Sequence, residues 1–380
     1  MSNFDETISE SPRKRQRQVD DSRQDHEDDL PFNQQIPSRT SDWREIHLSR
    51  LNIEIDCSTL SAIGVLTYGY TEFLKNDPVH PVSEVVEKLY ASRNPQIRAN
   101  YECCMFACMD FLTIDSDTIF DISSEHIKKL IMEVEKPFRR SKFGKWLESF
   151  LVGKGDIMKD YVMDTCRSIH IRVKDFCDQL LYMVECGEIE TRDEMYRELF
   201  MLFLRIFDIK MRQCANYKKT TSVVAIGEKT IISIPDALIC KTTKTSPSSE
   251  KVLAVIEVKK YGKTYDRKLS ENLHNTEKGK AHDPIGSNLK GKHVGDMVAA
   301  LPESVFGLNG IYGIIVQGTE VTLSSMAVGE NWFEHVTSGS LHSTPVIVKH
   351  SSPYNILRQR DRENLIQTFV DMKSLLDHLV

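Results

Sequence analysis

The sequence predicts a protein of mixed α/β class. Apolar residues recur at three- and four-residue spacing across residues 41–189, which is typical of amphipathic helices. From residue 190 onward, a helical pattern is followed by β-like runs, a second helical pattern, two more β-like runs and a final helical pattern. Strands that alternate with helices in this order indicate a sheet covered by helices. We therefore expect a central mixed sheet flanked by helices and preceded by an all-α region.

Composition divides the chain into four segments. Residues 1–40 are polar and contain few large apolar side chains, so we expect a disordered tail there. A helical region at 41–189, an α/β domain at 190–350 and a C-terminal helix within 351–380 follow. The longest apolar run, LFMLFLRIF, is interrupted by Arg205 and is too short to span a bilayer, so no membrane association is expected.

The tail contains a compact basic cluster. Arg13, Lys14, Arg15 and Arg17 lie within SPRKRQRQ, and an acidic run follows them. Such a cluster is typical of a nuclear localisation signal, and a solvated charge run has the same composition. We expect the nucleus as the location, with the cytoplasm as the alternative.

The nine cysteines predict a reducing compartment. No two form a CxxC pair, and the closest group, Cys103, Cys104 and Cys108, has no histidine nearby to complete a metal site. Reduced cysteines buried in a core account for this distribution.

Each helix of the first region is predicted from its own apolar spacing. The helix at 124–136 also has a start signal, because serine precedes its first turn. We expect these helices to position a substrate or bind a protein partner. The predicted helices cover residues 83–93, 99–112, 124–136, 142–152 and 169–185.

The α/β domain begins with a strongly amphipathic helix at 190–210. Met195, Leu199, Leu202 and Ile206 form its apolar stripe. The polar insert KTTKTSPSSE separates the second and third β-like runs and suits a hairpin loop. The remaining elements are strands at 222–227, 230–240 and 252–260, a helix at 290–301, two strands within 310–328 around a turn at Gln317 and Gly318, and a helix at 357–380.

Charged residues interrupt the apolar hairpin. Glu257 and Lys259 share one face of their strand, and the hairpin partner brings Asp236 beside them. Two carboxylates at the edge of an apolar sheet repel each other and lose hydration, so a cation is expected to neutralise them. Hard oxygen ligands suit Mg²⁺ or Mn²⁺. The alternative interpretation is a cross-strand salt bridge on an exposed edge.

Pro235–Asp236, followed by Glu257–Val258–Lys259, resembles the PD-(D/E)xK nuclease superfamily, which has the restriction-endonuclease-like fold. The resemblance covers roughly residues 190–350. It implies metal-dependent hydrolysis of a nucleic-acid phosphodiester, with DNA as the expected substrate. Asp236 and Glu257 would hold the metal with the backbone carbonyl of Val258, and Lys259 would orient or deprotonate the attacking water.

The resemblance also directs attention to the two flanking helices. Many members add an acid from the preceding helix, and here Glu198 is the preferred candidate over Glu194. Members often carry glutamine on the following helix, where this sequence has Lys292. This departure favours an alternative function, a catalytically inactive nuclease-like module for nucleic-acid binding or assembly. A third possibility is a helical scaffold in which the acidic hairpin is incidental.

The stretch from Lys241 to Lys292 is basic in an otherwise acidic chain. It has twelve Lys or Arg residues against six Asp or Glu residues. A groove that binds phosphates has this composition, as does a solvated lysine-rich loop. The expected nucleic-acid contacts are Lys260, Lys263, Lys290 and Lys292. The histidines of this region, His274, His282 and His293, are expected to be surface residues.

Overall fold

The computed structural model confirms the mixed α/β class. It describes residues 36–75, 102–106, 109, 112–136, 142–153, 155–213, 221–241, 250–260 and 285–378. Several predicted features lie outside the described residues: the basic cluster of the tail, the helix at 83–93, Cys108, Lys263, His274 and His282.

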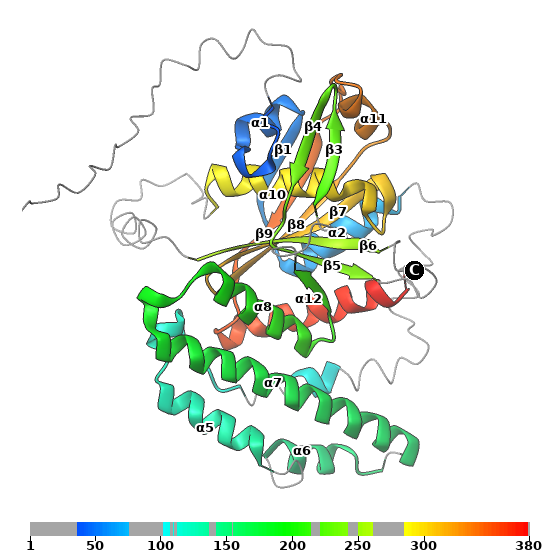
Figure 1. The fold of residues 1–380 in the computed structure, drawn as a ribbon. Coiled ribbons are helices and arrows are strands. Elements are labelled where there is room, and N and C mark those ends of the chain that lie inside the picture. Colours follow the sequence, from blue (N-terminus) through cyan, green and yellow to red (C-terminus); the bar gives the residue numbers. More distant parts are fainter. Residues whose placement is uncertain are drawn as a thin grey trace, which may run out of the picture.

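A mixed sheet of eight strands forms the centre of the described part of the chain (Figure 1). The strand order is β1-β9-β8-β7-β6-β5-β2, and β10 pairs with β8. Strand β6 is antiparallel to β5 and parallel to β7, which in turn is antiparallel to β8. The bounds are Ile53–Leu60 (β1), Met211–Gln213 (β2), Ala237–Lys241 (β5), Lys251–Lys259 (β6), Gly310–Gln317 (β7), Glu320–Ala327 (β8), Val346–Ser351 (β9) and Tyr354–Asn355 (β10). The predicted hairpins β5–β6 and β7–β8 are therefore confirmed, but the single strand expected at 230–240 is wrong, because it divides into β4 (Lys229–Ser233) and β5, which belong to different sheets.

Strand β1 corrects the expectation that residues 41–189 are all helical. It pairs in parallel with β9, from Ile53 opposite Val346 to Asp56 opposite Lys349. The alternation in IEIDCSTL has the period of a strand, but it is short and stands among helical patterns. The N-terminal part of the described chain is consequently built into the α/β unit.

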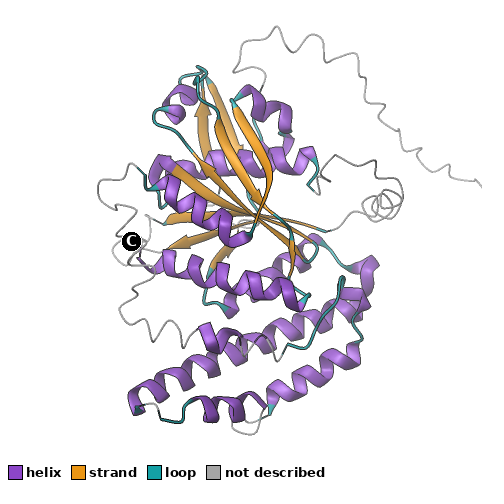
Figure 2. Cartoon of the chain, turned by 180° about the vertical axis from the view of Figure 1, so that it is seen from behind, coloured by secondary structure: helices purple, strands orange, loops and turns teal. Residues whose placement is uncertain are grey.

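Helices cover both faces of the sheet (Figures 1 and 2). Helices α1 (Glu45–Arg50), α10 (Ser287–Ala300) and α11 (Trp332–Thr337) contribute to one core cluster, together with a separate hairpin of β3 (Ser222–Ile226) and β4 (Lys229–Ser233). Helices α2 (Ala62–Phe73), α8 (Asp193–Ile206) and α12 (Gln359–His378) contribute to the other core. Beyond α8 lie α5 (Ser124–Glu135), α6 (Lys142–Phe150) and α7 (Asp156–Glu190), so the helical patterns at these positions are confirmed. None of the described helices is long and apolar enough to cross a membrane.

Helix α8 is buried more widely than its predicted stripe. Leu199 and Ile206 are fully buried, whereas Met195 and Leu202 are partly buried. The helix also buries aromatic residues, because it lies between the sheet and α7. Its Phe203 ring meets the ring of Phe369 in α12 at 6.0 Å. This contact fixes α8 against α12, and α8 also packs on β6, the strand that carries Glu257.

The six cysteines whose side chains the structure describes are thiols rather than disulfides, as expected. Cys104, Cys166 and Cys177 are buried, while Cys103 is exposed. Burial raises the pKa of the Cys177 thiol to about 12, so this thiol is unreactive at neutral pH.

The structure also corrects the boundary of the expected tail at residue 40. Ile36 is 0% exposed and Trp43 is 1% exposed. The indole of Trp43 donates to the Pro37 carbonyl at 2.9 Å, and the amide of Ile232 in β4 donates to the Ser38 carbonyl at 2.8 Å. Residues 36–43 thus belong to the folded unit, and the isolated Ile36 and Trp43 were the apolar signals in the sequence.

Replacing Ile36 with alanine tests this attachment. We expect Ile36→Ala to lower the free energy of unfolding by about 2–4 kcal/mol, because a fully buried side chain leaves a cavity. Ile189→Ala is the matched control, since Ile189 is 91% exposed and its removal should change stability by less than about 0.5 kcal/mol. Urea denaturation of both variants gives the comparison. Equal effects would show that Ile36 is not anchored.

Candidate metal and phosphate site

Asp236, Glu257 and Lys259 come together at one end of the sheet. Asp236 stands directly before β5, and its backbone amide donates to the Ile256 carbonyl of β6 at 3.1 Å. Its Oδ2 accepts from the Val258 amide at 2.8 Å. Lys259 Nζ lies 2.9 Å from Glu257 Oε1 and 3.8 Å from Asp236 Oδ2. The hairpin register therefore places both carboxylates around one ammonium group.

The Glu257 side chain is completely buried, with 0% exposure. Strand β6 is covered by α8 on one face and by α10 on the other, so its interior residues have no access to solvent. Burial raises the pKa of Glu257 to about 7, against the lowering effect of Lys292. Although Oε1 is close to Lys259, it has no hydrogen bond of good geometry. The buried carboxylate is therefore held between the ammonium groups of Lys259 and Lys292.

Lys292 and Asp296 reach the cluster from α10. Lys292 Nζ contacts Glu257 Oε2 and lies 3.2 Å from Asp296 Oδ2. Asp296 Oδ1 accepts from the hydroxyls of Thr40 and Ser233, the latter at 2.7 Å. Burial alone would lower the pKa of Lys292, but the carboxylates of Asp296 and Glu257 outweigh it and raise the pKa. Lys292 consequently stays protonated between the two acids.

Helix α8 contributes Asp193 and Arg197, which the sequence did not single out. Arg197 Nη1 lies 3.7 Å from Asp236 Oδ1. Asp193 Oδ2 lies 3.9 Å from Lys259 Nζ, and Oδ1 accepts from the Lys260 amide at 2.7 Å. The two residues are one helical turn apart and share a row with the buried Met201. This shared row with a buried residue is the sequence signal that could have placed Asp193 and Arg197 on the inward face of α8.

The expected helix acid, Glu198, does not join the cluster. Glu198 and its alternative Glu194 are exposed on the neighbouring row of α8. This row continues to Leu202, which is only partly buried. Glu198 therefore lies outside the cluster, and the side chain of α8 that faces Asp236 is the cation Arg197.

The predicted nucleic-acid contacts divide into separate environments. Lys290 is not at the surface: its side chain is 2% exposed and pairs with Glu45 at 3.3 Å. Lys260 Nζ donates to the Thr191 carbonyl at 2.9 Å and so ties β6 to the end of α7. His293 is also buried, contrary to expectation, with Nε2 3.2 Å from the Ser324 hydroxyl. Only Lys292 of the described candidates lies in the cluster.

We call the seven charged residues at this end of the sheet the ion cluster. When all are ionised, three cations face four carboxylates, which leaves one net negative charge. A phosphate group is not attracted to a cluster with a net negative charge unless a further cation binds there. The members are Arg197, Lys259, Lys292, Asp193, Asp236, Glu257 and Asp296.

The donor set of the ion cluster fits Mg²⁺. Within the described ranges, no three His, Cys, Asp or Glu residues converge closely enough to enclose a metal. Mg²⁺ does not need such a cage, because it is commonly held by one or two carboxylates and keeps several waters. Among the described residues, Glu257 Oε1 has the Lys259 ammonium group at 2.9 Å, and Asp236 Oδ1 has the Arg197 guanidinium at 3.7 Å. These two oxygens are the available ligands.

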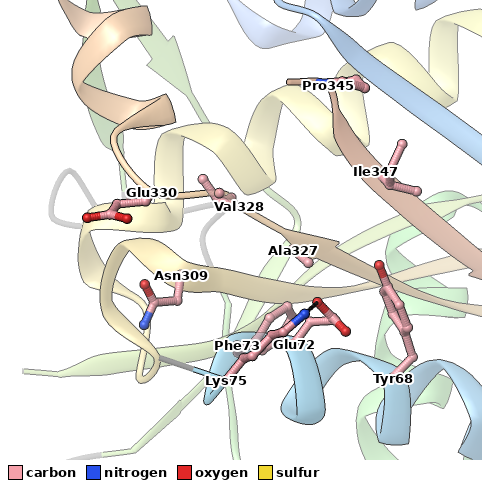
Figure 3. A pocket seen from close by; sticks show the side chains of 11 residues that line it. Tyr68, Glu72, Phe73, Lys75, Asn309, Ala327, Val328, Glu330, Pro345 and Ile347 are labelled. Carbon is pink, nitrogen blue, oxygen red and sulfur yellow. Dashed lines mark ion pairs between the residues drawn. The ribbon is translucent and has the colours of Figure 1, made fainter. Parts of the chain in front are cut away.

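A pocket of about 650 Å³ lies at the opposite end of β7 (Figure 3). Its lining includes Tyr68, Asn309 and Glu330, and no member of the ion cluster. Glu72 and Lys75 on its wall face each other at 3.8 Å. Asn309 precedes β7, whereas Gln317 at the other end of this strand pairs with Lys259. The pocket and the ion cluster are therefore separate features.

The buried carboxyl group predicts a pH-dependent stability. The metal-free folded protein keeps the Glu257 proton up to about pH 7, whereas the unfolded chain releases it near 4.5. The stabilisation is present below pH 4.5 and is lost as pH rises through 7. Between pH 4.5 and 8, wild type should lose about 2–3 kcal/mol of unfolding free energy relative to Glu257→Gln. Urea titrations across this range measure it, and a difference independent of pH would contradict it.

Comparisons with known proteins identify no relative: no family model, no curated protein and no solved structure matches this chain. The fold is described at the level of a mixed α/β protein with a central sheet. The ion cluster is accordingly the feature that indicates a function.

Proposed function

We propose that the protein is a metal-dependent phosphodiesterase that acts on nucleic acid, with DNA as the expected substrate. The observation that carries this proposal is the fully buried Glu257 carboxylate beside Asp236 and Lys259. Burying ion pairs often costs more free energy than their attraction returns. An apolar sheet that nevertheless holds several charges is typical of a functional site.

The order of elements agrees with the restriction-endonuclease-like fold that the sequence motif suggests. Helix α8 precedes the antiparallel β5–β6 hairpin, and α10 connects β6 to the parallel strand β7. Asp236 stands at the start of β5, and Glu257 and Lys259 stand at the end of β6. This agreement supports the proposal at the level of topology.

Each residue of the cluster has a role in the proposed chemistry. Asp236 and Glu257 would hold Mg²⁺, or Mn²⁺, with the main-chain carbonyl of Val258. The bound metal supplies a more acidic water and polarises the phosphate. Lys259, which is a cation beside both carboxylates, would orient the water and offset negative charge on the phosphate. Arg197 adds a second cation on the α8 side.

A second candidate function is an inactive nuclease-like module that binds nucleic acid or assembles with other proteins. The contact between Lys292 and Glu257 favours it, because a resident ammonium group already neutralises one proposed metal ligand. A protein partner could bind the outer helices, where Met132, Ile171 and Tyr182 expose apolar side chains. The basic cluster at Arg13–Arg17 supports a nuclear location as a further proposal.

Loss of one proposed metal ligand tests the function. Asp236→Asn should reduce Mg²⁺-dependent cleavage by on the order of a hundredfold or more, because one of two carboxylate ligands is lost. Glu198→Gln is the matched control and should cleave like wild type, since this carboxylate is exposed outside the cluster. Cleavage of single-stranded DNA, double-stranded DNA and RNA is measured for all three proteins. Wild-type rates in Asp236→Asn would exclude the metal assignment, and binding without cleavage by wild type would favour the inactive module.

Substitution of Lys259 separates catalysis from binding. Lys259→Met should lower kcat by on the order of a hundredfold, as for loss of one donor to the transition state. The affinity for nucleic acid should fall only slightly. The slope of the logarithm of the binding constant against the logarithm of the salt concentration should change by about one unit, because one phosphate contact is lost. Single-turnover rates and salt-dependent binding curves provide both values. Equal losses in rate and affinity would mean that Lys259 only anchors a phosphate.

A further inference from the structure

Lys292 bridges two buried carboxylates that belong to different elements. Its ammonium group contacts Glu257 on β6 and lies 3.2 Å from Asp296 on its own helix. Both carboxylate side chains are 0% exposed, while Lys292 is 16% exposed. The lysine therefore compensates two acids that water cannot reach.

Asp296 is held in place independently of Lys292. The hydroxyls of Thr40 and Ser233 donate to its Oδ1, and they come from two segments distant in sequence. Its other oxygen, Oδ2, remains directed at the lysine that lies four residues earlier on α10. Among the described residues, Glu257 accepts from no hydroxyl group, and its ion pairs are with Lys259 and Lys292.

The two carboxylates differ in what else can neutralise them. Glu257 is one of the proposed metal ligands, so a divalent cation there would repel the Lys292 ammonium. Asp296 lies on the same helix as Lys292 and can keep it as a partner after such a displacement. Neither Lys292 nor Asp296 would then be left as an unpaired buried charge, which is the costly outcome.

We propose that Lys292 is an exchangeable counter-ion of Glu257 and that Asp296 is the positioning residue that retains it when a divalent cation binds. This inference rests on the proposed metal site. In the metal-free protein, Lys292 competes with the metal for Glu257. Asp296 weakens that competition because it attracts the same ammonium group. The pair therefore sets the metal affinity of the site.

The exchange predicts opposite effects for the two partners. Lys292→Gln should tighten metal binding about tenfold, because the competing charge is gone while a polar side chain remains. Asp296→Asn should weaken it about three- to tenfold, because Lys292 then has only Glu257 as a partner. When Lys292→Gln is already present, the addition of Asp296→Asn should leave the metal affinity almost unchanged. If Asp296 acted directly on the metal as a distant charge, its effect would be equal in both backgrounds.

Calorimetric titration of the full-length protein with Mn²⁺, without nucleic acid, measures these affinities. Urea denaturation checks that each variant is folded. Lys349→Gln is the charge-matched control, since Lys349 pairs with Asp56 on strands away from β6, and it should bind Mn²⁺ like wild type. Ser233→Ala removes one donor from Asp296 and should give a smaller weakening. This milder variant replaces Asp296→Asn if the latter does not fold.

The outcomes separate this inference from the proposed function. If Glu257→Gln binds Mn²⁺ as well as wild type, the metal site is wrong and the exchange is overturned with it. If Glu257→Gln loses binding but Lys292→Gln does not tighten it, the metal site stands and the exchange alone is overturned. Equal effects of Asp296→Asn with and without Lys292 would also overturn the exchange. Tighter binding in Lys292→Gln together with the loss of the Asp296 effect supports it.

Discussion

The burial of Glu257 is the constraint on which this end of the molecule depends. Strand β6 lies between α8 and α10, so a carboxylate in its interior loses all contact with water. An isolated buried carboxylate would cost several kcal/mol, and the neighbouring elements must therefore supply positive charge. Lys259 comes from the same strand and Lys292 from α10, while Arg197 of α8 approaches the adjacent Asp236.

This compensation extends to the N-terminal residues of the described chain. Lys292 is shared with Asp296, which accepts a hydrogen bond from Thr40, 256 residues earlier in the sequence. The same turn brings Trp43 onto α10 at Gly295, where a Cβ atom would lie 2.7 Å from the indole ring. Glycine is required at this position by the close approach of the two segments. Packing of residues 36–43 and the electrostatics of Glu257 are thus parts of one arrangement.

Features that depend on neighbouring residues were predictable from the sequence. The β5–β6 hairpin, helices α8 and α10 and the adjacency of Asp236, Glu257 and Lys259 follow from strand alternation and a short loop. Features fixed by distant partners were missed. The pairing of β1 with β9 joins residues 293 apart, as in the ion pair of Asp56 with Lys349. The burial of Lys290 is not predictable from the sequence, because its partner, Glu45, is remote in sequence.

The incomplete bonding of the ion cluster bears on the choice between an active and an inactive site. A purely structural cluster is most favourable when every buried polar atom has a partner, because a partly satisfied network is costly. Among the described residues, Glu257 Oε1 lies 2.9 Å from the Lys259 ammonium group without good hydrogen-bond geometry, and Asp236 Oδ1, on a side chain that is 24% exposed, lies 3.7 Å from the Arg197 guanidinium. The two oxygens belong to the residues that the motif assigns to a metal. A divalent cation would complete their bonding and change the net charge from negative to positive, as phosphate binding requires. Under the proposed function a divalent cation would take the place of an ammonium group beside Glu257, whereas the inactive module would keep the ion pairs of Glu257 with Lys259 and Lys292.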